Sequence, residues 1–127
     1  MYKELIIIVV VITLIVGLDI ITNKYTKETL ESLYNELNIL EKYILIEEKE
    51  KCIKQMKKIK QEWEKRYKIL AFYIEHDELE KVETEMVKLE ADIKVEEYTH
   101  CISEVKTTIF ILEHIKDKEK LQLESIF

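Results

Sequence analysis

Three histidines, His76, His100 and His114, are the residues of this sequence that most readily suggest metal chemistry. His76 stands among carboxylates in the segment EHDE. Zinc ligands on one helix usually lie three or four residues apart, as in H-E-x-x-H. No two histidines have that spacing, so we expect no metal and no other cofactor. We instead expect His76 to form a hydrogen bond at a helix junction, where Asp77 is the N-cap and Glu80 closes a capping box.

A second candidate site is a group of aromatic residues on one predicted helix: Trp63, Tyr67, Phe72 and Tyr73. Packing in a hydrophobic core explains this group, and a groove for a peptide, lipid or small ligand remains the alternative. Glu62 and Glu64 flank Trp63 but fall on different helix faces, so they do not form a paired-carboxylate site. The residues to follow for an interaction or a helix junction are Trp63, Tyr67, His76 and Asp77.

The nucleophilic residues point to no catalytic site. Cys52 and Cys101 fall on or beside predicted apolar stripes, where we expect buried free thiols. A disulfide between them would need an oxidising compartment and Cα atoms within about 7 Å. No serine lies in a G-x-S-x-G elbow. We therefore expect a protein that is not an enzyme.

The composition of the 127 residues favours a helical protein. One glycine and no proline argue against hairpin-rich β architectures and phosphate-binding glycine loops. The net charge is −6, and every basic residue except Arg66 is a lysine. Nucleic-acid binders usually carry positive charge and use arginine for bidentate contacts, so we expect no nucleic-acid partner.

The segment 5–21 is long and apolar enough to enter a membrane, since about 17–25 such residues span a bilayer. Its polar residues are Thr13, which can bond back within a helix, and Asp19, which lies near one end. A cleaved secretory signal is the main alternative, but the segment lacks a pair of small residues at its end. A buried core helix is another alternative, but this segment is apolar all round whereas the rest of the protein is strongly amphipathic. We expect an uncleaved transmembrane anchor over 1–22, with the membrane as a partner.

The orientation of this anchor follows from its short head. Lysines on the two sides of the segment are nearly balanced, so the positive-inside rule gives little guidance. Only four residues precede the apolar segment. A head this short is expected to stay in the cytosol, which places the body outside the cytoplasm.

The second predicted domain, 23–127, reads as about four amphipathic helices with apolar residues at spacings of three and four. The first carries Leu30, Leu33, Tyr34, Leu37, Leu40 and Ile44. The second carries Cys52, Met56, Ile59, Trp63, Tyr67, Leu70 and Ile74. The third carries Leu79, Val82, Met86, Leu89 and Ile93, and the fourth Tyr98, Ile102, Val105, Ile109 and Leu112. An apolar tail closes the chain with Leu121, Leu123, Ile126 and Phe127. The predicted class is all-α: an N-terminal transmembrane helix followed by a small antiparallel bundle.

Helix boundaries are weakly marked without glycine or proline. We place the breaks at 47–51, at His76–Asp77, at 95–97 and at Lys116–Asp117. Nothing between Asp19 and Thr29 forces a stop, so the anchor and the first body helix can form one continuous rod.

The sequence resembles an uncharacterised family of short bacterial proteins that have one N-terminal membrane span and a helical body. The resemblance rests on the span, on EWEKRYKI around Trp63, on FYIEHDELEKVE around His76 and on the ending ILEHIKDKEKLQLESIF. The chain departs from the family pattern at Leu70 and Ser125. Because the family is a domain of unknown function, the resemblance implies an architecture and no activity.

Together these features favour a membrane-anchored, extracytoplasmic interaction or structural module of the bacterial cell envelope. A protein partner or self-association is expected. The alternative is a ligand-sensing helical domain that binds a small molecule or peptide near the Trp63–His76 region.

Overall fold

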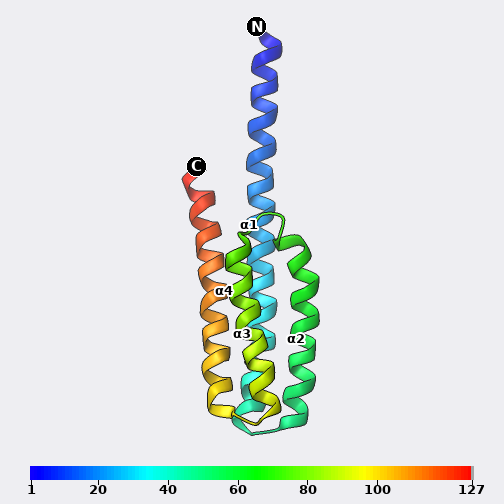
Figure 1. Cartoon of the computed structure of the whole chain (residues 1–127). Helices are drawn as coiled ribbons and strands as arrows, with labels where there is room; N and C mark the ends of the chain where they lie inside the picture. Colours follow the sequence, from blue (N-terminus) through cyan, green and yellow to red (C-terminus); the bar gives the residue numbers. More distant parts are fainter. Residues whose placement is uncertain (127) are drawn as a thin grey trace.

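The computed structural model describes residues 1–126 and consists of four helices joined by short loops (Figure 1). They are α1 (Tyr2–Leu45), α2 (Lys49–Leu70), α3 (His76–Lys94) and α4 (Tyr98–Ile126). The all-α prediction is confirmed, because residues 1–126 contain no strand. Phe127, the last residue of the predicted apolar tail, lies outside the described residues.

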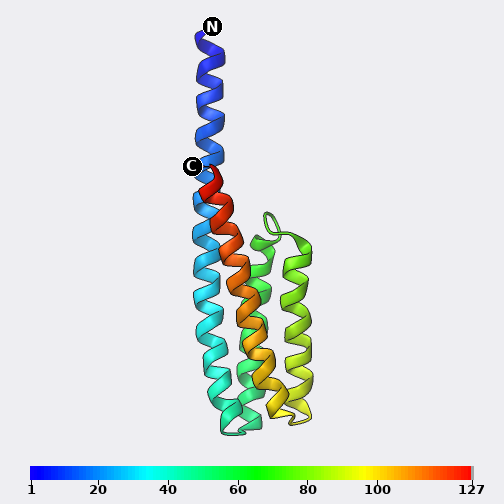
Figure 2. The same cartoon turned by 90° about the vertical axis from the view of Figure 1, so that its left-hand side faces the viewer.

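The helices form an antiparallel bundle in which each helix packs against two neighbours. α1 contacts α2 and α4, and α3 contacts the same two helices from the other side. The N-terminal half of α1 projects alone beyond the bundle (Figures 1 and 2). The C-terminal end of α4 extends past the α2–α3 loop toward the projecting part of α1.

The core lies along the bundle axis and matches most of the predicted stripes. All five stripe residues of α3 are buried, and so are those of α1 except Tyr34. Tyr34 is 42% exposed, so its assignment to the core was wrong. In α2, Tyr67 is half-buried while the other predicted residues up to Leu70 are buried. The helix ends at Leu70, earlier than predicted, so Ile74 is buried from the α2–α3 loop. Burial of these apolar side chains is the main stabilising contribution to the fold.

The predicted stripe of α4 is confirmed at Val105 and Leu112, which are buried, but it is wrong at two other positions. Its residues Ile102 and Ile109 are only half-buried. Cys101 and Thr108, each one position earlier, are fully buried. The hydroxyl group of Thr108 donates to the Glu104 carbonyl at 2.7 Å, which lets a polar side chain occupy the core. The prediction was wrong at these positions because Ile102 and Ile109 lie on the helix face next to the core face, with the same seven-residue spacing as Cys101 and Thr108.

Two helices end without glycine by placing a glutamate in the left-handed region. Glu47 after α1 has φ 56° and Glu96 after α3 has φ 60°. The amide of Glu96 donates to the Ile93 carbonyl at 3.2 Å, and the amide of Glu97 donates to the Asp92 carbonyl at 2.9 Å. These bonds form a Schellman motif. The end of α1 has the same pattern.

The predicted break at Lys116–Asp117 is wrong, because α4 runs through it without interruption. No proline or glycine lies there to end the helix. The predicted breaks after α1 and after α3 are confirmed within two residues. The prediction of a continuous rod is also confirmed, since α1 carries both the apolar segment and the first body stripe.

The apolar N-terminal segment has the length and composition of a membrane span. Its most apolar stretch is unburied in the structure. Leu14 and Leu18 are each 61% exposed. One helix therefore carries an uncovered apolar end and a core-forming end.

Candidate interaction groove between α2 and α3

Trp63 of α2 lies at the interface with α3, where its indole is both packed and hydrogen-bonded. The side chain is 3% exposed. Its Nε1 donates to Glu83 Oε1 on α3 at 3.2 Å. The ring of Tyr67 lies beside it, with centroids 6.0 Å apart and planes tilted by 57°, a geometry that aromatic pairs favour. The structure thus brings Trp63 and Tyr67 together, as the helical spacing predicted.

Next to Trp63 the surface between α2 and α3 is hollowed into a groove, which we call the α2–α3 groove. One part has a volume of about 440 Å³. It is lined by Lys60, Trp63, Glu64, Glu83, Met86, Val87, Glu90, Ala91 and Lys94. A second part of about 320 Å³ continues it toward Ile53 and shares Lys60, Glu64, Glu90 and Lys94 with the first. The groove therefore follows about three helical turns.

The floor of the α2–α3 groove is apolar and its edges include exposed apolar side chains. Met56, Met86 and Ile93 form buried parts of the lining. Val87 is 70% exposed and Ile53 is 37% exposed. Methionine side chains adapt to irregular partners, which suits a floor of this kind.

A charge pair crosses the groove where its two parts meet. Lys60 Nζ lies 2.7 Å from Glu90 Oε2. The hydrogen bond from Lys60 lowers the pKa of Glu90, and the same bond raises the pKa of Lys60. Lys94 also approaches Glu90, at 3.4 Å. These groups can bind charged edges of a ligand, while the floor can bind its apolar face.

His76 and Asp77 lie away from this groove, and their predicted roles at the helix junction are wrong. α3 begins at His76, and its N-cap residue is Glu75, which makes no side-chain capping bond. Asp77 is therefore inside the first turn, where its carboxylate interacts favourably with the helix dipole instead of capping. Among the described residues the His76 side chain forms no hydrogen bond, and its Nε2 lies 3.9 Å from Glu80 Oε2 at an exposed position.

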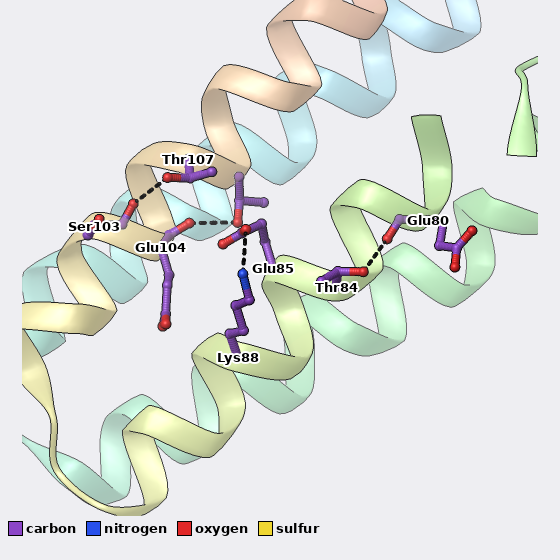
Figure 3. A network of polar contacts seen from close by, with 8 residues as sticks. Glu80, Thr84, Glu85, Lys88, Ser103, Glu104 and Thr107 are labelled. Atoms are coloured by element: carbon purple, nitrogen blue, oxygen red, sulfur yellow. Dashed lines mark hydrogen bonds and ion pairs between the residues drawn. The ribbon is translucent and has the colours of Figure 1, made fainter. Parts of the chain in front are cut away.

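A second polar cluster lies between α3 and α4 (Figure 3). Glu85 and Lys88 of α3 form an ion pair at 3.4 Å, near the α4 segment that carries Glu104. Burial and the charge of the neighbouring Asp92 carboxylate together raise the pKa of Glu104 to about 8. Glu104 is thus a carboxylic acid that retains its proton near neutral pH.

The sequence interpretation missed most of these residues. It did not identify Glu83, Lys60 or Glu90, because charges beside a stripe look the same whether they face solvent or a groove. The sequence did contain an indication of the groove, in Ile53 and Val87. Each follows a stripe residue directly and so adds apolar surface outside the core.

The arrangement suits binding better than catalysis. In the part of the chain that the structure describes, no three His, Cys, Asp or Glu side chains are placed to hold a metal ion. The perturbed carboxylic acid Glu104 does not line the groove, where Lys60 and Lys94 both pair with Glu90. An apolar floor between charged edges is typical of a surface that receives a peptide.

Comparison with known proteins supports the expected relationship. The family model DUF4363, described as a domain of unknown function, matches residues 20–126. No curated protein and no solved structure matches the chain.

Proposed function

This chain belongs to the DUF4363 family, and we propose that it is a membrane-anchored helical module that binds a protein partner without catalysing a reaction. The observation that carries the proposal is the construction of α1. This single helix continues from an uncovered apolar segment into the core of the bundle. A helix of this kind would hold the bundle at a fixed height above a bilayer.

The exposed segment 5–21 needs a covering that the chain itself does not supply. Soluble monomers rarely expose apolar patches larger than a few hundred Å². Lipid is the covering that fits a segment apolar on every side, because a protein partner would normally cover one face only. We place the bundle on the extracytoplasmic side of a bacterial cell membrane.

The α2–α3 groove is the surface that we assign to the partner, and its occupant is an amphipathic helical segment. The two parts of the groove together extend along about three turns, which suits an elongated segment lying over the Lys60–Glu90 pair better than an enclosed small molecule. Anchors spaced three, four and seven residues apart on one helix face would contact Met56, Met86 and Val87. The charges of Lys60 and Glu90 would select the polar residues at the edges of that face.

The anchor is tested by fractionation and protease accessibility of the full chain in cells. We expect a full-length product in the membrane fraction whose bundle is digested by protease added to intact spheroplasts. Recovery of a soluble product that begins near residue 20 would contradict the anchor. Complete protection of the bundle in intact spheroplasts, with digestion after lysis, would reverse the orientation.

The groove is tested with a photo-crosslinking amino acid at Val87, compared with the same probe at Phe110. Both side chains are 70% exposed, but Phe110 lies on α4 outside the groove. We expect a discrete crosslinked product from Val87 alone, with the crosslink mapped to an amphipathic helix of the partner. The same product from both positions would show that the groove has no special role.

A further inference from the structure

The α2–α3 loop is fastened to α1 at the end of the apolar segment. The hydroxyl group of Tyr73 donates to the Thr22 carbonyl at 3.1 Å. It also lies 2.7 Å from Thr26 Oγ1. Thr22 directly follows the apolar segment 5–21. These bonds fix the loop at the level where α1 leaves its apolar part (Figure 1).

Among the described residues of the bundle, the loop residue next to Tyr73 has the most exposed aromatic side chain. Phe72 is 90% exposed. Ile69, at the end of α2, is 48% exposed. Phe72 is therefore an apolar residue without a protein contact that would explain it, held by its neighbour at one defined height along α1.

The end of α4 adds apolar surface at the same end of the molecule. α4 extends beyond the loop toward the N-terminal half of α1 (Figures 1 and 2). Glu119 is close enough to Asp19 of α1 for that charge to raise its pKa, after the larger effect of burial. Beyond Glu119, Leu121 is 65% exposed and Leu123 is half-buried.

We propose that the end of the bundle nearest the anchor is a second membrane contact, with Phe72 and Leu121 inserted into the lipid headgroup region. This inference rests on the proposed anchor, because α1 sets the height of the bilayer surface. Aromatic side chains are favourable at that depth, where their rings remain partly hydrated. The occupant is lipid and not a protein, because the same helix that enters the bilayer holds Phe72 at its surface.

Charge does not drive this contact. Lysines and carboxylates alternate at this end of the molecule, as in Lys118 and Glu75, which pair at 3.4 Å. We therefore expect insertion into neutral phosphatidylcholine, with no requirement for anionic lipid.

The contact is tested with tryptophan probes in the full chain, reconstituted into phosphatidylcholine vesicles with or without brominated acyl chains. Bromine quenches only tryptophans that reach the lipid. The variants are Phe72→Trp, Leu121→Trp, and Phe110→Trp as a matched control at an exposed position further along the bundle. Trp63 is buried in the bundle and supplies a constant background, measured in the unmodified chain. We expect the added emission of Phe72→Trp and Leu121→Trp to be blue-shifted and mostly quenched, and that of Phe110→Trp to persist.

A fourth variant separates the two proposals. Leu14→Trp places the probe within the apolar segment. Quenching of Leu14→Trp together with full emission from both Phe72→Trp and Leu121→Trp would overturn the second contact while keeping the anchor. Absence of quenching in Leu14→Trp would overturn the anchor itself. Equal quenching of Phe72→Trp and Phe110→Trp would show that the bundle lies flat on the lipid, which also contradicts the proposal.

Discussion

Trp63 and Glu83 join α2 to α3 through a hydrogen bond of 3.2 Å at the edge of the α2–α3 groove. The indole thereby has two functions: its ring fills the core, and its N–H is satisfied by the carboxylate that lines the groove. Loss of the ring and loss of the hydrogen bond are therefore expected to have different consequences.

Replacement of Trp63 by alanine should lower the free energy of unfolding by about 3–5 kcal/mol, as large truncations in cores do. Glu83→Ala removes the hydrogen-bond acceptor and leaves the buried indole N–H unpaired, which should cost about 1–3 kcal/mol. Both values can be measured by urea unfolding followed by circular dichroism. A Trp63→Ala variant as stable as the unmodified chain would place the indole outside the core.

The turns that end α1 and α3 each contain a residue that glycine could replace with a gain in stability. Glu96 and Glu47 adopt positive φ angles, a region that costs a residue with a side chain about 1–2 kcal/mol. Glu96→Gly should remove this cost and raise the melting temperature. The gain in stability is reduced because glycine has a greater conformational entropy in the unfolded chain.

The matched control is Glu80→Gly, which places glycine at an exposed position inside α3. There the substitution should destabilise the fold by about 1 kcal/mol. If Glu80→Gly and Glu96→Gly destabilise the fold equally, Glu96 is not in the left-handed region in solution.

The apolar spacing predicted most of the fold because the bundle core is built from it. The stripes of α1 and α3 were identified nearly completely, since charged residues surround them on both sides. The stripe of α4 was misplaced at two positions because Cys101 and Thr108 are less apolar than Ile102 and Ile109, which lie on the next face. Which side chains of α4 are buried depends on the helix face that contacts α1 and α3. The spacing of apolar residues along α4 alone does not determine that face.

The candidate site was predictable only in part. Trp63 and Tyr67 share a helix face, so their contact followed from spacing alone. The groove depends on the distance between α2 and α3, which no local pattern contains. Asp77 was assigned as a cap because helix starts are inferred from residue types, whereas the backbone of α3 begins earlier, with Glu75 as the N-cap residue. A helix boundary shifted by two residues thus changes a capping residue into a first-turn residue.

Cys101 is expected to resist alkylation in the folded protein. The side chain is fully buried, and burial together with the smaller effect of the Glu104 charge raises the pKa of Cys101 to about 12. Burial also raises the pKa of Cys52. Since the thiolate is the reactive form, iodoacetamide should modify both cysteines only when the bundle opens.

Mass spectrometry of alkylated protein, with and without urea, measures this protection. The variant Val87→Cys supplies an exposed thiol on the same fold and should react rapidly in the absence of urea. If Cys52 and Cys101 react as fast as that thiol, the α2 and α4 core faces are open in solution.

Glu104 should make the bundle less stable as the pH rises. Its pKa in the folded state is about 8, whereas the ordinary value is 4.5. Between these two values the folded chain holds a proton that the unfolded chain has lost, so the free energy of unfolding falls with increasing pH. The stabilising effect of the proton is complete below about pH 4.5 and is lost as the pH passes through about 8.

Glu104→Gln keeps a neutral side chain at every pH, so its melting temperature should exceed that of the unmodified chain above about pH 8 and approach it at low pH. Glu113→Gln, an exposed position on the same helix, controls for the change in net charge. The difference between the Glu104→Gln and Glu113→Gln profiles isolates the buried carboxylic acid, and parallel profiles would show that Glu104 titrates as an exposed residue.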